Sequence, residues 1–165
     1  MSLLTQKLED LRRNYLYIEQ NLIALEKNYL ERFVFLMDNI RLWLNDSIEK
    51  GLLSYTENDM RVALSDVHRV VFKEIRIQTS FNDRGIDIIP VGLNYKDKEI
   101  MGNVSIEKFS KDPSSVAILF GTNIVLSRTD NEWYIRVSNK FDILAPHQYL
   151  LCNEENFTNL LVEFL

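Results

Sequence analysis

The chain has 165 residues, of which 46% are apolar and 26% charged, with only 5 Gly and 3 Pro. This composition is typical of a single folded domain and excludes a collagen-like or low-complexity chain. The formal net charge is −5, with 10 basic and 12 acidic side chains in residues 1–75 and 9 and 12 in residues 76–165. Because binding to a phosphate backbone needs a basic excess, which neither half has, we expect no nucleic-acid partner.

The first fifty residues predict a long N-terminal helix. They contain no Gly or Pro, and Gly51 is the residue type that commonly follows the end of a helix. Apolar side chains recur alternately every four and every three residues, at Leu4, Leu8, Leu11, Tyr15, Ile18, Leu22, Leu25 and Tyr29. This spacing places them along one side of a helix, in a pattern that resembles a coiled coil.

The length of this helix raises the question of what covers it. A straight helix of about 50 residues is about 75 Å long, whereas a compact domain of this size has a radius of gyration of about 15 Å. The helix therefore either projects and pairs with another polypeptide, or breaks near Asp38-Asn39 and folds back as a helical hairpin. The absence of Gly and Pro favours the continuous form.

We accordingly expect a protein partner, a second copy of the chain, or both, along the N-terminal helix. The side chains predicted to bind this partner are Leu8, Leu11, Tyr15, Ile18, Leu22, Leu25 and Tyr29.

A second helix is predicted over residues 57–71. Thr56 can cap it, and apolar residues follow at helical spacing: Met60, Ala63, Leu64, Val67 and Val71. From Glu74 the apolar period changes to two, which predicts a strand over residues 73–80. We therefore predict one domain, residues 1–165, with a helical part at 1–72 and a β part at 73–165.

The β part is predicted to be an antiparallel sheet with consecutive strands joined by turns. Its clearest hairpin joins residues 122–127 to residues 132–137, with four cross-strand pairs: Leu126 with Trp133, Ile124 with Ile135, Val125 with Tyr134 and Asn123 with Arg136. A short helix over residues 156–165 ends the chain. The predicted fold class is α+β, with a long N-terminal helix, a second helix, an antiparallel meander and a short C-terminal helix.

The sequence offers little that predicts catalysis. The chain has two histidines, His68 and His147, and neither belongs to a short metal-binding motif; no nucleotide-binding or hydrolase motif is present. The single cysteine, Cys152, follows the apolar residues 149–151, where a buried and unreactive thiol is expected. We predict no catalytic residues, no metal site and no cofactor.

Membrane insertion and secretion are also not predicted. The N-terminus lacks a basic segment followed by an unbroken apolar run, and no stretch approaches the 18 or more apolar residues of a membrane span. With one cysteine the chain cannot hold an internal disulfide, so we expect a cytoplasmic protein.

These observations lead to two hypotheses of function. The first is a non-enzymatic interaction or regulatory protein, such as an adaptor, an inhibitor of the antitoxin kind or a chaperone, which associates through its N-terminal helix. The alternative is a small-molecule-binding domain or enzyme with a pocket between the sheet and the helix at 57–71. In that case Asp142 and His147, in the loop Asn139–Gln148, would lie at the mouth of the pocket.

Overall fold

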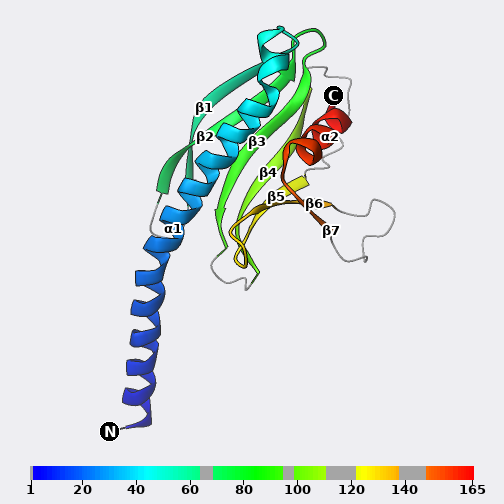
Figure 1. Ribbon diagram of the computed structural model, residues 1–165. Coiled ribbons are helices and arrows are strands. Elements are labelled where there is room, and N and C mark those ends of the chain that lie inside the picture. Colours follow the sequence, from blue (N-terminus) through cyan, green and yellow to red (C-terminus); the bar gives the residue numbers. More distant parts are fainter. Residues whose placement is uncertain (1, 64–68, 95–98, 111–121, 138–147) are drawn as a thin grey trace.

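The computed structural model describes residues 2–63, 69–94, 99–110, 122–137 and 148–165. It confirms an α+β fold with a long N-terminal helix, an antiparallel meander and a short C-terminal helix (Figure 1). The elements are α1 (Leu3–Glu49), β1 (Leu53–Ala63), β2 (Arg69–Thr79), β3 (Arg84–Leu93), β4 (Ile100–Ser110), β5 (Thr122–Ser127), β6 (Trp133–Val137), β7 (Gln148–Leu151) and α2 (Glu154–Phe164). Each strand pairs with the next in the chain, so β1 and β7 form the two edges of the sheet.

Helix α1 runs for 47 residues without a break, as its lack of Gly and Pro predicts. Ser2 caps its N-terminus by accepting a 3.2 Å hydrogen bond from the Thr5 amide. At the other end Gly51, with a φ of 72°, takes the left-handed conformation that closes many helices. The helix continues through Asp38-Asn39, so the helical hairpin does not form.

One face of the sheet carries the hydrophobic core. Alternate residues of the central strands are fully buried, and among them are Ile75, Ile77, Ile86, Ile88, Ile106 and Ile124. The C-terminal half of α1 and one side of α2, with Phe157 and Leu161, contribute to this same core. The ring centroids of Trp43 on α1 and Phe157 on α2 are 5.9 Å apart, so both helices lie on this face.

The helix predicted over residues 57–71 is wrong, because the described part of this segment is β-structure. Strands β1 and β2 form a hairpin in which Met60 lies opposite Phe72 and Val62 opposite Val70. These four side chains belong to or pack against the core, so the apolar period that matters here is two. Over a few residues, apolar positions three and four apart, as in a helix, overlap with apolar positions two apart, as in a strand. The helical part therefore ends at Glu49, not at residue 72.

The predicted hairpin over residues 122–137 is confirmed in its register. Strands β5 and β6 pair Asn123 with Arg136, Ile124 with Ile135, Val125 with Tyr134, and Leu126 with Trp133. Helix α2 begins two residues earlier than predicted, because Asn153 caps it by accepting a 2.9 Å hydrogen bond from the Asn156 amide.

Candidate protein-interaction surface

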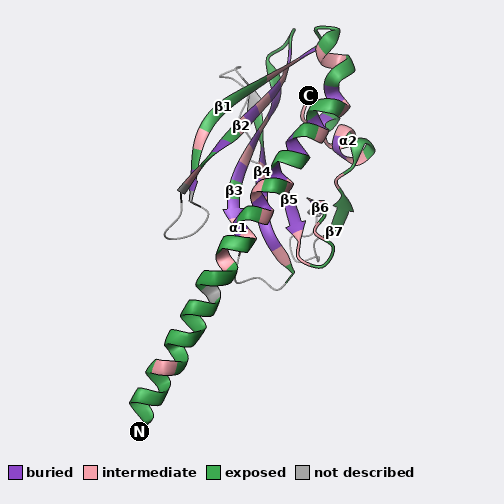
Figure 2. Cartoon of the chain, turned by 60° about the vertical axis from the view of Figure 1, so that its left-hand side comes forward, coloured by how far each residue is buried: buried purple, intermediate pink, exposed green. Residues whose placement is uncertain are grey.

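Helix α1 is longer than the sheet that it packs on. Its C-terminal half lies along the sheet, whereas residues 3–24, here named the projecting segment, extend past the sheet's end (Figure 1). The projecting segment is coloured almost entirely as exposed in Figure 2. Its exposed large apolar side chains are Leu3, Leu4, Leu8, Leu11, Tyr15, Leu16, Tyr17 and Ile23.

The directions of these side chains follow from helix geometry. Eighteen residues make about five turns at about 3.6 residues per turn, so residues 18 apart point to the same side of a straight helix. Leu4 therefore points to the same side as Leu22 and Ile40, and Ile40 faces the sheet with 0% of its surface exposed. Leu4 itself is 68% exposed.

The same relation holds along the whole segment. Leu11 has the direction of Tyr29, which is 0% exposed, while Leu11 is 53% exposed. Tyr15 has the direction of the buried Phe33, 18 residues further along α1. We name Leu4, Leu8, Leu11, Tyr15 and Leu22 the apolar stripe. It continues the core-facing side of α1 past the point where the sheet stops.

The seven residues predicted to bind a partner do not all lie on this free surface. Leu8, Leu11 and Tyr15 are exposed, and Leu22 is partly exposed. Leu25 is partly buried against the chain's own core, and the side chain of Ile18 lies outside the described residues.

Tyr29 is a correction to the prediction, because it lies inside the chain's own core. Its ring contacts those of Phe33, Phe72 and Trp133, and its hydroxyl donates a 2.8 Å hydrogen bond to the main-chain oxygen of Asn103. Burial raises the pKa of Tyr29 well above its ordinary range. The burial of Tyr29 could not be predicted from the spacing of apolar residues, because this spacing is the same in the exposed and the buried part of α1.

A glycine on the sheet makes room for Tyr29. A Cβ atom added at Gly102 would lie 2.5 Å from the Cδ2 and Cε2 atoms of the Tyr29 ring. The bare backbone of β4 at this position therefore lets the ring lie directly against the strand. The sheet thus covers α1 from about this point onward.

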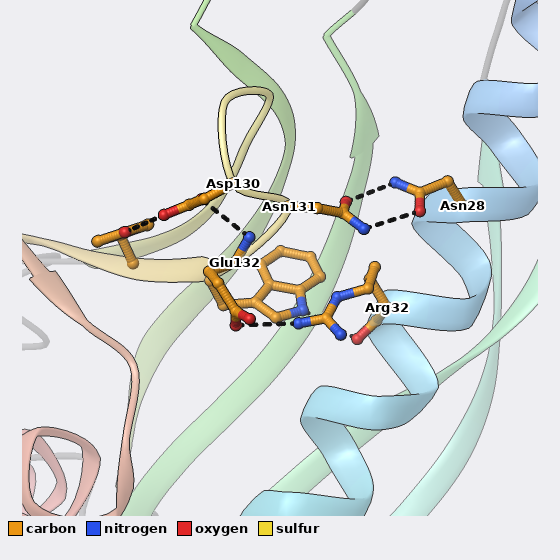
Figure 3. A network of polar contacts seen from close by, with 7 residues as sticks. Asn28, Arg32, Asp130, Asn131 and Glu132 are labelled. Atoms are coloured by element: carbon orange, nitrogen blue, oxygen red, sulfur yellow. Dashed lines mark hydrogen bonds and ion pairs between the residues drawn. The ribbon is translucent and has the colours of Figure 1, made fainter.

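Polar contacts fix α1 where the projecting segment ends. Asn28 and Asn131 exchange two side-chain hydrogen bonds of 2.7 and 3.1 Å, and Arg32 forms a 3.1 Å ion pair with Glu132. Trp133 donates from its indole Nε1 to the main-chain oxygen of Arg32 at 2.9 Å. We name these five residues the β5–β6 clamp (Figure 3). The sequence predicted the turn between β5 and β6, but nothing in it indicated that this turn holds the helix.

The polar residues of the projecting segment balance in charge. Its charged side chains are three basic ones, Lys7, Arg12 and Arg13, and three acidic ones, Glu9, Asp10 and Glu19. Residues 3–24 therefore have a net charge of zero, whereas the whole chain has a net charge of −5. Arg13 and Asp10 form an exposed ion pair at 3.9 Å. The apolar stripe therefore lies on a segment that does not repel another copy of itself.

The residues considered for catalysis gain no support as a site. His68, Asp142 and His147 lie outside the described residues. Cys152 is described and is largely shielded from solvent, and its burial raises the pKa of the thiol to about 12. In the described ranges no group of three or more His, Cys, Asp or Glu side chains is placed to hold a metal ion.

Two further findings concern the setting of this surface. Of the described helices, neither combines the length and the apolar character that crossing a membrane requires. No protein-family model matches the chain, and no curated protein or solved structure matches it.

Proposed function

We propose that this chain is a non-enzymatic interaction protein that binds another polypeptide through the apolar stripe of its projecting segment. The observation that carries the proposal is that the core-facing side of α1 is repeated on a segment that no described strand covers. Leu4, Leu8 and Leu11 remain in water on the same side of the helix as residues that are fully buried further along. Burying one such leucine stabilises a complex by about 1.5–3 kcal/mol.

The spacing of the stripe favours a helical partner. Anchors separated alternately by four and three residues are the arrangement with which one amphipathic helix packs against another or lies in an apolar groove. The β5–β6 clamp supports this role, because it holds α1 at Asn28 and Arg32, just past the projecting segment. A helix held in this way is presented to its partner already formed, which lowers the entropic cost of binding.

Such an activity is that of an adaptor, an inhibitor or a chaperone, and we place it in the cytoplasm. A single cysteine with a shielded, proton-retaining thiol is consistent with a reducing compartment. The alternative hypothesis places a pocket between the sheet and a helix at 57–71, but the described part of that segment belongs to strands β1 and β2. No observation favours this alternative over the interaction protein.

The proposal is tested by comparing two double variants of the full chain as baits in quantitative affinity capture. L8E/Y15E places two carboxylates in the stripe, and V34E/L42E places two at exposed positions in the sheet-packed half of the same helix. We expect polypeptides captured by the unmodified chain to be lost with L8E/Y15E and kept with V34E/L42E. Capture that is unchanged by L8E/Y15E, in a variant with unchanged circular dichroism, would refute the proposal.

A further inference from the structure

We infer that the polypeptide covering the apolar stripe is a second copy of this chain, running antiparallel, so that two projecting segments cover each other about a two-fold axis. The inference rests on the proposed function and names its partner. It follows from the direction in which the stripe points, from the length of the free segment and from its charge.

The direction of the stripe excludes a parallel pair. Since Leu4 and Leu22 point to the same side as Ile40, the stripe faces the side of α1 on which the sheet lies. In a parallel pair with stripes in contact, the C-terminal half of each α1 would have to occupy the space of the other copy's sheet. That space is filled by the chain's own core.

An antiparallel pair avoids this conflict. The two sheets then lie at opposite ends of the paired helices, beyond the tips of the projecting segments. Pairing Leu4 of one copy with Leu22 of the other also brings Leu11 level with Tyr15. The overlap from residue 4 to residue 22 is about 27 Å long at about 1.5 Å per residue, and it uses the part of α1 that the sheet leaves uncovered.

The segment is also electrostatically suited to meet itself. Residues 3–24 hold three basic and three acidic side chains and therefore have no net charge, although the whole chain has a net charge of −5. The two projecting segments meet without net repulsion between them. In a two-fold pair each copy supplies the same surface, so both stripes are covered in one contact. The stripe of each copy is then occupied and is not free to recruit a third copy.

The first experiment measures the mass of the full chain in solution by sedimentation and light scattering from submicromolar to tens of micromolar. We expect a concentration-dependent dimer of twice the 19.5 kDa chain mass. The variant L11E should remain a monomer over the whole range, and the control L42E, which changes an exposed leucine of the same helix, should still dimerise. A chain that stays monomeric throughout would overturn the inference.

The second experiment tests the orientation by disulfide formation in a C152S background. Paired cysteines have Cα atoms about 4.4–6.8 Å apart, whereas two copies of residue 4 lie about 27 Å apart in the antiparallel pair. A mixture of L4C and L22C chains should form the crossed disulfide, and L4C alone should form none. A rapid L4C–L4C disulfide would overturn the antiparallel arrangement.

These outcomes separate the inference from the function on which it rests. A monomeric chain whose captured partners are lost with L8E/Y15E would disprove the second copy and leave the interaction protein standing. A monomeric chain whose capture is also unchanged by L8E/Y15E would disprove both.

Discussion

The indole nitrogen of Trp133 donates a 2.9 Å hydrogen bond to the main-chain oxygen of Arg32, across 101 residues of sequence. It joins the first residue of β6 to the middle of α1, and the Trp133 ring also contacts Tyr29 with 6.0 Å between ring centroids. The carbonyl oxygen of Arg32 also accepts the main-chain hydrogen bond of the helix, so the bond from Trp133 is an additional contact between β6 and α1. It sets where α1 lies on the sheet, and thereby the direction in which the projecting segment leaves the domain.

Replacing Trp133 by Phe should separate the hydrogen bond from the packing. W133F keeps an aromatic ring but loses the donor, and we expect it to lower the free energy of unfolding by about 1 kcal/mol. W133A also removes the ring and should cost about 3–5 kcal/mol. Urea unfolding followed by circular dichroism measures both. A W133F variant as stable as the unmodified chain would show that the indole N–H contributes nothing beyond the ring.

Adding a methyl group at Gly102 should disturb the seat of Tyr29. In G102A the new Cβ would lie 2.5 Å from two ring atoms, and we expect a loss of about 1–3 kcal/mol from overpacking. The comparison variant is G51A, which meets no atom within 4 Å but holds a φ of 72° and should cost about 1 kcal/mol. Urea midpoints at equal protein concentration compare them. A G102A variant as stable as the unmodified chain would contradict the close packing of Tyr29 on β4.

Leu11 and Tyr29 point to the same side of α1 and should nevertheless respond differently to substitution. Because Leu11 is exposed, L11E should change the free energy of unfolding of the monomer by no more than about 0.5 kcal/mol. Because Tyr29 fills the core, Y29A should cost about 3–5 kcal/mol, as truncation of buried aromatic residues does. The measurement is chemical unfolding at submicromolar concentration, where association is minimal. A large loss in L11E under these conditions would mean that the chain itself covers the stripe.

The Cys152 thiol should make stability fall at alkaline pH. Burial raises its pKa from 9.0 to about 12. Below pH 9 both the folded and the unfolded chain hold the proton, so the contribution of the thiol to stability is fully present. As the pH rises from 9 toward 12, only the unfolded chain releases the proton, and this contribution is lost.

The control for this effect is C152A, whose unfolding retains the titration of the tyrosines but not that of the thiol. As the pH rises above 9, the unmodified chain should therefore lose stability relative to C152A. Urea midpoints at several pH values measure the difference, and reaction with a thiol reagent at neutral pH should be slow until the chain is unfolded. A stability difference that does not change with pH would count against the buried thiol.

How much of this structure could be predicted depends on the distance over which each signal acts. The sequence predicts the register of the β5–β6 hairpin because the alternating residues and the turn residues lie within 16 consecutive positions, 122–137. In the segment at 57–71, Met60 and Val71 fit a helical spacing locally, whereas Met60 in fact pairs with Phe72 across the β1–β2 hairpin. Short apolar runs satisfy both periods, and only the partner strand decides between them.

The continuity of α1 follows from its local sequence, since no Gly or Pro interrupts residues 1–50, and so does the side of the helix on which its apolar residues lie. Which part of that side is core and which is free surface depends on the packing of the sheet. Leu11 and Tyr29 are indistinguishable in helical position, but Gly102 and the β5–β6 clamp bring the sheet to Tyr29, and no described strand reaches Leu11. This difference arises because helix period depends on neighbours within a few residues, whereas burial depends on where a sheet formed from distant residues comes to an end.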